Sequence, residues 1–243
     1  MKHFKADLHV HTCLSPCAEL DMSPKAVVEK SLEKHLDIIA ICDHNSAENV
    51  EASIRAAARY DLRVLAGIEI NSVEEVHTLA IFESAEKASV MQETVYNHLK
   101  GTNRPELFGD QVVANEWDEV EGFNDRLLIG AVDLELKDIV REVKKLGGLS
   151  IASHVDRPSY SILGQLGFVP PDLELDGLEV ANPDHWKAMA GTEKYPLVYS
   201  SDAHFLSVVG AVATRFLMES PNLEEIRLAL AGESGRRVEG WIA

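Results

Sequence analysis

Runs of apolar residues alternate with amphipathic segments along most of the chain, and this alternation predicts strands that alternate with helices. The strands are expected at residues 4–11, 36–44, 62–70, 76–82, 149–154, 175–182, 195–204 and 208–219, with a closing segment at 236–243. The helices are expected at residues 23–35, 48–60, 84–100, 132–146 and 222–232. Continuous apolar runs are typical of strands buried on both faces, and their alternation with helices favours parallel strands with crossover helices. The pattern therefore predicts an α/β fold.

Two helix starts can be predicted from their capping residues. Ser23 is placed to cap the helix at 23–35, because Pro24 follows it at the first helical position. Asn45 or Ser46 is expected to cap the next helix in the same way.

One segment, residues 101–126, shows no sustained period and contains an acidic cluster at 117–125. The whole chain has 243 residues, a length at which one α/β barrel is routinely built from a single chain. We therefore expect one barrel domain over residues 1–243, with an insertion at about residues 101–130 that is a candidate lid over one end of the barrel.

Composition and charge narrow the class of protein. Hydrophobic residues make up 46% of the chain, as in globular proteins with a sizeable core. No apolar stretch approaches the roughly 18 residues of a membrane span, and the N-terminal residues show no secretory signal, so a cytoplasmic protein is expected. Lys and Arg number 23 against 40 Asp and Glu, and the resulting net charge of −17 repels a phosphate backbone. We therefore expect a small substrate, and neither nucleic acid nor a membrane as a partner.

Histidines and cysteines gather around the end of the first predicted strand. His9 and His11 are two positions apart, so on a strand their side chains point the same way and can converge on one metal ion. An isolated pair of this kind is more often a solvent-facing feature of an edge strand. The three cysteines, an odd number, do not describe a disulfide framework. Because Cys13, Cys17 and Cys42 lie in or beside histidine-rich stretches, they are considered as metal ligands rather than as partners in disulfides.

Polar residues recur where other predicted apolar strands end, and this raises the weight of the metal hypothesis. The residues at such ends are Asp7, His9, His11, Asp43, His44, Glu69, His154, Asp202 and His204. Five of the ten histidines of the chain are among them. In (β/α) barrels the C-terminal ends of the strands surround one mouth, so these residues are expected to meet there. His77 is the exception, because it stands at the start of its apolar run.

A mixed set of imidazoles and carboxylates suits divalent zinc, manganese or iron. The set holds more ligands than one ion can use, which indicates two or three ions with Glu69 as a candidate bridge. Two neighbouring ions can hold a hydroxide between them and clamp the attacking and leaving oxygens of a phosphoester, so no Ser or Cys nucleophile is needed. The sequence accordingly contains no G-x-S-x-G elbow, Walker loop or dinucleotide fingerprint.

Six ordered motifs, covering nearly the whole chain, resemble those of the polymerase and histidinol phosphatase (PHP) family. They are DLHVHT, CDHN, GIEI, the histidine of VHTLAIF, ASHVDRP and SSDAH. The resemblance implies a distorted seven-stranded (β/α) barrel of the TIM-like kind and hydrolysis of phosphoesters at a two- or three-metal site. It also implies three ligand sets: His9, His11, Glu69 and Asp202; Glu69, His77 and His154; and His44 with His204 and one further ligand.

The further ligand of the third set is where this sequence departs from the family pattern. Members usually place an Asp five residues, or a His six residues, after the second histidine of the first motif. Those positions are Pro16 and Cys17 here. Three alternatives remain at this stage: Cys17 is a thiolate ligand, Asp21 is the ligand, or the third site is weak or empty.

Three more residues have candidate roles beside the metals. Arg157, in the loop after the fifth predicted strand, is either a bidentate phosphate clamp or an exposed loop arginine. Asp7 and Asp43 are adjacent to ligand histidines and are expected to orient them rather than bind metal.

The sequence therefore predicts a phosphoesterase that uses a metal-bridging hydroxide to hydrolyse a small phosphate monoester or diester. One alternative is an amidohydrolase-type enzyme, because the same hydroxide can attack an amide carbon. Another is a regulatory module that binds metal without turnover. A nucleic-acid-processing role is less favoured, because the chain is acidic and has no basic stripe.

Overall fold

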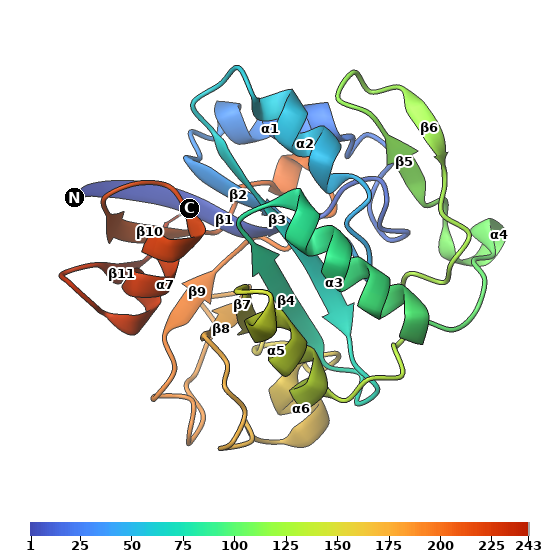
Figure 1. Cartoon of the computed structure of the whole chain (residues 1–243). Coiled ribbons are helices and arrows are strands. Elements are labelled where there is room, and N and C mark those ends of the chain that lie inside the picture. The colour runs from blue at the N-terminus through green and yellow to red at the C-terminus, as the bar shows by residue number, and fades with distance from the viewer. Residues whose placement is uncertain (243) are drawn as a thin grey trace.

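The computed structural model describes residues 1–242, in which one sheet curls into a nearly closed, distorted barrel (Figure 1). The strands of this sheet follow the order β11-β10-β1-β2-β3-β4-β7-β8-β9. Their bounds are β1 Lys2–Val10, β2 Ile38–Ile41, β3 Arg63–Asn71, β4 His77–Phe82, β7 Leu149–Ala152, β8 Gly177–Val180, β9 Leu197–Tyr199, β10 Ala213–Met218 and β11 Arg237–Ile242. The expected α/β barrel is confirmed, and its wall consists of β1 to β4 and β7 to β9.

The barrel closes between its first and last wall strands. The segment after β9 runs beside β1, where Val10 and Ala203 form an isolated parallel bridge. The His11 amide donates to the Ala203 carbonyl at 3.0 Å, and the Ala203 amide donates to the His9 carbonyl at 3.3 Å. These bonds join opposite ends of the chain at the place where both ends carry predicted metal ligands.

Strand β4 runs against the expected direction. β1, β2 and β3 are parallel, as are β7, β8 and β9, but β4 is antiparallel to both β3 and β7. The connection between β3 and β4 spans only residues 72–76, whereas a parallel pair needs a crossover of roughly a dozen residues or more. The expectation of uniformly parallel strands is therefore wrong for β4.

Strands β10 and β11 extend the sheet beyond β1 as antiparallel neighbours. The predicted strand at 208–219 corresponds to β10, although the strand begins later, at Ala213. The predicted closing segment at 236–243 forms β11 as far as Ile242, and residue 243 lies outside the described range.

Except for α4, which belongs to the segment 101–130, the helices pack against the sheet from outside the barrel wall (Figure 1). Their bounds are α1 Pro24–Glu33, α2 Val50–Ala57, α3 Ala85–His98, α4 Pro105–Phe108, α5 Leu136–Lys145, α6 Ile162–Leu166 and α7 Leu223–Ala231. Alternate residues of β2 divide between two apolar clusters: Ile39 and Ile41 pack with α1 to α3, and Ile38 and Ala40 pack with β7 and α7. Burial of both faces explains the continuous apolar run of this strand. Within residues 1–242, no helix combines the length and apolarity needed to cross a membrane.

One of the two predicted helix caps is correct. The Ser23 hydroxyl accepts a backbone amide of the first turn of α1 at 3.3 Å. Helix α2 begins later than expected, at Val50, and the side chain of neither Asn45 nor Ser46 caps it. The Asn45 amide instead donates to two backbone carbonyls of the segment 101–130, both at 2.8 Å.

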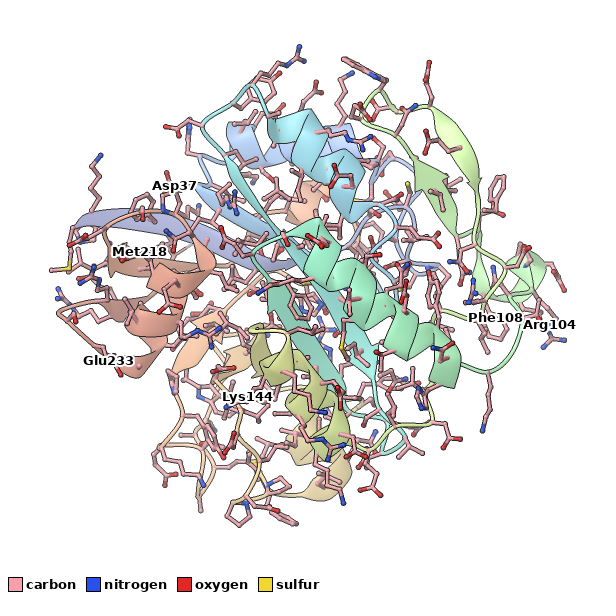
Figure 2. The ribbon with its side chains drawn as sticks, in the orientation of Figure 1. Asp37, Arg104, Phe108, Lys144, Met218 and Glu233 are labelled. Atoms are coloured by element: carbon pink, nitrogen blue, oxygen red, sulfur yellow. The ribbon has the colours of Figure 1, made fainter. Side chains whose placement is uncertain are left out.

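The segment 101–130 forms a small substructure beside α2 (Figure 1). Two isolated bridges close its base, and it contains α4 and a hairpin of β5 (Val112–Ala114) and β6 (Val120–Phe123). Arg104 and Phe108, which pack on each other at the two ends of α4, lie at its outer edge (Figure 2). Its inner side is tied to the loop after β1, because the Val112 amide donates to the Cys13 carbonyl at 2.9 Å.

Candidate metal centre

All eight predicted ligands lie together at one end of the barrel. They are His9 in β1 and His11 just after it, His44 after β2, Glu69 near the end of β3, His77 at the start of β4, His154 after β7, and Asp202 and His204 after β9. Each of them is buried except His204, whose side chain is 19% exposed. The fold therefore concentrates imidazoles and carboxylates at one mouth, as the strand-end pattern predicted.

Three groups of side chains are close enough to hold metal ions, because the three ligand atoms of each group lie within 4.8 Å of one another. The groups are His9, His11 and Asp202; His44, Glu69 and His77; and His11, His44 and His204. The second group differs from the expected second set, since His44 takes the place of His154. His154 is still close, with its Nε2 atom 3.2 Å from Oε1 of Glu69.

Glu69 lies at the centre of the cluster, and its two oxygens face different histidines. Oε1 is 3.0 Å from Nδ1 of His77 and 3.2 Å from Nε2 of His154. Oε2 is 3.0 Å from Nδ1 of His44 and 3.5 Å from Nε2 of His11. Burial alone would raise the pKa of Glu69, but the imidazoles around it hold that pKa well below its usual range. The neighbouring imidazoles thus favour the charged form of Glu69, and its two oxygens face four of the candidate ligand histidines.

The antiparallel course of β4 explains how His77 joins the cluster. Because β4 runs opposite to β3, its first residue pairs with Asn71 at the end of β3. The start of one strand and the end of the other thus lie at the same mouth. Tyr160 supports this position, since its carbonyl accepts the His77 amide at 2.9 Å and its ring stacks on the imidazole at a centroid distance of 4.9 Å.

Two residues that the sequence analysis did not identify fix the rings of His9 and His11. Glu179, a buried carboxylate of β8, lies 2.9 Å from Nδ1 of His9 and also accepts the His154 amide at 2.9 Å. The Ser15 hydroxyl lies 2.9 Å from Nδ1 of His11, and because it donates to Asp43 at 2.7 Å it accepts from that ring. Both rings therefore commit Nδ1 as a donor and turn Nε2 into the cluster.

The Nε2 atoms of His9 and His11 lie 3.0 Å apart, and Oδ1 of Asp202 is 3.3 Å from the first and 3.1 Å from the second. Two ring nitrogens with lone pairs repel at this distance unless a cation, a proton or a metal ion, lies between them. The buried Nδ1 of His154 also has no hydrogen-bond partner among the described residues. This donor set, which combines imidazole nitrogens with carboxylate oxygens, fits a borderline divalent metal ion.

Asp7 and Asp43 brace the loops that carry the ligands, in line with the orienting role expected for them. Asp43 accepts the Thr12 amide and the Thr12 hydroxyl, both at 2.7 Å. Asp7 accepts the Ser201 amide at 3.0 Å and the Gly210 amide at 2.9 Å, while burial raises its pKa to about 6. The oxygens of both carboxylates thus accept hydrogen bonds from neighbouring residues of the chain.

The structure distinguishes the candidates for the remaining ligand near His44 and His204. The Cys17 thiol lies beside both imidazoles; although burial of the thiol would raise its pKa, their hydrogen bonds lower it to about 6. Asp21 and Cys17 are both exposed and belong to none of the three ligand groups. Of the two, Cys17 is the side chain that lies against His44 and His204, so it is the better-placed candidate.

A cavity of about 300 Å³ opens beside the cluster, and Arg157 lines it. Nη1 of Arg157 is 2.5 Å from Oδ2 of Asp202, although 47% of the arginine side chain remains exposed. Apolar groups of Ile129, Pro158 and Tyr160 line other parts of the cavity. Arg157 thus places a guanidinium at the edge of the buried cluster, beside the cavity.

Comparison with solved structures shows the same fold in several proteins. The lesion-specific endonuclease Q of Pyrococcus furiosus matches 98% of this chain with a TM-score of 0.76 and 19% identity. This chain spans only 58% of the endonuclease. An endonuclease Q complex with a 27-mer duplex that carries an abasic lesion matches with a TM-score of 0.75. A provisionally assigned metal-dependent phosphoesterase of Bifidobacterium adolescentis matches 82% of this chain and 87% of its own, with a TM-score of 0.55 and 19% identity.

Sequence comparison identifies the family. An uncharacterised protein of Methanocaldococcus jannaschii is 24% identical over 190 residues, which cover 74% of this chain and 83% of that protein. Residues 7–117, which hold His9, His11, His44, Glu69 and His77, match the PHP domain. Together with the barrel, this match confirms the resemblance of the six motifs to the PHP domain family.

Proposed function

We propose that the protein is a metal-dependent phosphoesterase that hydrolyses a phosphate ester in the cavity beside the histidine cluster. The observation that carries this proposal is the position of Glu69 next to Arg157, because its Oε1 faces His77 and His154 while its Oε2 faces His44 and His11. A central carboxylate of this kind suits a pair of metal ions, and two-metal sites are a recurrent solution for phosphoester hydrolysis.

Zinc, manganese or iron would be held by three sets of side chains: His9, His11, Glu69 and Asp202; Glu69, His77 and His154; and His44, His204 and Cys17. Bound divalent ions supply Lewis acidity, which polarises phosphoryl oxygens and lowers the pKa of coordinated water.

The chain itself supplies binding and orientation. Glu179 and Ser15 hold the rings of His9 and His11 so that Nε2 faces the site. Arg157 keeps most of its five N–H donors free of Asp202, and a guanidinium fork matches the oxygens of a phosphate. The ligand side chains around Glu69 are themselves buried, which strengthens the electrostatic contacts among them.

Phosphate release from a panel of phosphate monoesters and diesters tests the proposal, with protein reconstituted in turn with manganese, zinc and iron. Arg157→Ala should lower kcat/KM about tenfold or more, because it removes charged hydrogen bonds to the phosphate. Arg141→Ala is the matched control, since Arg141 is an exposed arginine of α5 that does not line the cavity. Turnover of amides without phosphoester turnover would contradict the proposal, and fully metallated protein with no turnover of either class would favour a regulatory module.

A second candidate function is cleavage of nucleic acid, and the specific observation behind it is the match of 98% of this chain to an endonuclease. The net charge of −17 works against a broad phosphate-binding face but does not oppose a local contact at a metal site. Cleavage of a duplex with an abasic lesion, under the conditions of the phosphoester panel, distinguishes this candidate from a small-molecule phosphoesterase.

A further inference from the structure

A second hollow, of about 460 Å³, adjoins the mouth cavity. The two share Arg157 and Pro158, so these residues form the partition between them. The far side of the second hollow is formed by the segment between β8 and β9, with His185, Trp186 and Lys187. In Figure 1 this segment lies at the lower edge of the molecule, on the same side as α6. The mouth cavity thus continues past Arg157 and Pro158 into this second hollow, which is called the recess below.

The charges of this recess are unlike those of the rest of the protein. Arg157 and Lys187 bring positive charge to it, and His185 adds an exposed imidazole. Asp156 is the one carboxylate among its lining residues, and its two oxygens already accept the backbone amides of residues 181 and 182 at 3.0 and 2.7 Å. In a chain with a net charge of −17, the recess is therefore a local site for an anion.

The recess also offers a flat apolar surface. Trp186 is half-buried and packs against the apolar cluster beneath α6, so its indole is held in place. Met189, 46% exposed, lies beside it along the wall. A fixed indole and a thioether form a surface on which a planar ring can stack, while Lys187 can pair with an attached anionic group.

From this geometry we infer that the substrate is a phosphate diester whose second arm carries a planar ring and extends over Pro158 onto Trp186 and Lys187. The inference rests on the proposed phosphoesterase function and specifies its substrate class. The phosphoryl group lies in the mouth cavity within reach of Arg157, one arm of the ester remains there, and the other occupies the recess. A monoester has a single arm, so it cannot occupy the mouth cavity and the recess at the same time.

Two chromogenic substrates separate these cases: p-nitrophenyl phosphate, a monoester, and thymidine 3′-phosphate 5′-(p-nitrophenyl phosphate), a diester whose second arm carries a planar ring and an anionic group. Lys187→Ala should lower kcat/KM for the diester about tenfold, mainly through KM, and should change the monoester value less than about twofold. Lys194→Ala is the matched control, because Lys194 is an exposed lysine of the same segment that lines neither cavity. An equal effect of Lys187→Ala on both substrates, or none on either, would overturn the inference.

Binding gives a second measurement that does not depend on turnover. Thymidylyl-(3′→5′)-thymidine should quench tryptophan fluorescence of the metal-loaded protein in the first seconds after mixing, and Trp186→Phe should remove that quenching. Inorganic phosphate should quench much less, since it has no arm that reaches the recess. If neither chromogenic substrate turns over, the proposed function is contradicted, while this binding measurement still shows whether the ring binds in the recess. Equal quenching by the dinucleotide and by inorganic phosphate, or quenching that survives Trp186→Phe, would overturn the inference.

Discussion

At the scale of single residues, the least obvious member of the site is Glu179. A lone carboxylate with no exposed surface is costly unless it is paired, and here it is paired with two parts of the cluster at once, Nδ1 of His9 and the amide of His154. Burial lowers the pKa of His9, but the acidic neighbours, led by Glu179, raise it well above its usual range. Glu179 thus sets both the orientation and the basicity of a candidate ligand.

Replacement of this carboxylate by its neutral isostere tests that role. In Glu179→Gln the amide oxygen can still accept both hydrogen bonds, but the negative charge behind the His9 ring is lost. Metal affinity should therefore fall about ten- to hundredfold while the unfolding midpoint of the metal-free protein changes little. Competition with a calibrated chelator measures the affinity, and an unchanged value would show that Glu179 serves only the packing of β8.

Cys17 permits a spectroscopic test at the same scale. If its thiolate binds the metal held by His44 and His204, the cobalt(II)-substituted protein should show an intense sulfur-to-cobalt charge-transfer band in the near ultraviolet. Cys17→Ser should remove that band. Cys13→Ser should leave it in place, because the buried Cys13 thiol contacts the Val112 carbonyl instead. A band that persists in Cys17→Ser would exclude the thiolate as a ligand.

At the scale of elements, the segment 101–130 acts on the site through the loop after β1. The buried Asn49 joins them, since its side chain donates to the Thr12 hydroxyl at 2.9 Å and to the Val112 carbonyl at 3.0 Å and accepts the Ala114 amide at 3.0 Å. Of the residues in this segment, Ile129 lines the mouth cavity. The segment thus braces the loop of Ser15 and Cys17 as well as bordering the mouth.

Asn49→Ala tests the brace. The change leaves the buried Ala114 amide without its partner and the Val112 carbonyl with only the weak Cys13 thiol donor, which should lower the free energy of unfolding by about 2 to 4 kcal/mol. Urea denaturation of the metal-free protein measures this loss. Asn97→Ala, on the exposed face of α3, is the matched control and should change stability by less than about 0.5 kcal/mol. Similar small losses in both variants would show that the segment is not held through Asn49.

The same scale shows what could and could not be predicted from the sequence. Strand ends were informative, because a change from apolar to polar residues marks where a buried strand leaves the core. This pattern correctly predicted that His44, Glu69 and His154 lie at one mouth of the barrel. The position of His77 was uncertain because it depends on the direction of β4, which in turn depends on the connection before it. That connection is only five residues long, and its shortness was the available sign of an antiparallel strand. Glu179 was missed because it lies inside an apolar run, although a charge in such a run is itself a sign of a buried partner. Asn45 resembled a cap, but it bonds to residues more than eighty positions away, which no local pattern reports.

At the scale of the whole molecule, folding and metal binding should be coupled. The candidate ligands come from six separate segments and meet only when the barrel closes, so the unfolded chain lacks the complete sites. A ligand that binds only the folded state stabilises it by about 2.7 kcal/mol at a concentration of 100 times Kd. Short pairs such as His9 and His11 persist in the unfolded chain and bind metal weakly, which reduces this gain slightly.

Each bound ion should therefore raise the thermal midpoint by roughly 5 to 10 °C at that concentration, since a protein of this size gains about 2 to 4 °C per kcal/mol. Scanning calorimetry with chelator and with added manganese measures the difference. Glu69→Gln is the decisive variant, because the Glu69 carboxylate contacts histidines of more than one ligand group. Loss of this carboxylate should remove the rise in thermal midpoint that more than one ion contributes. Loss of a single share would show that Glu69 serves one ion, and an unchanged midpoint in the unaltered protein would show that the cluster does not bind manganese.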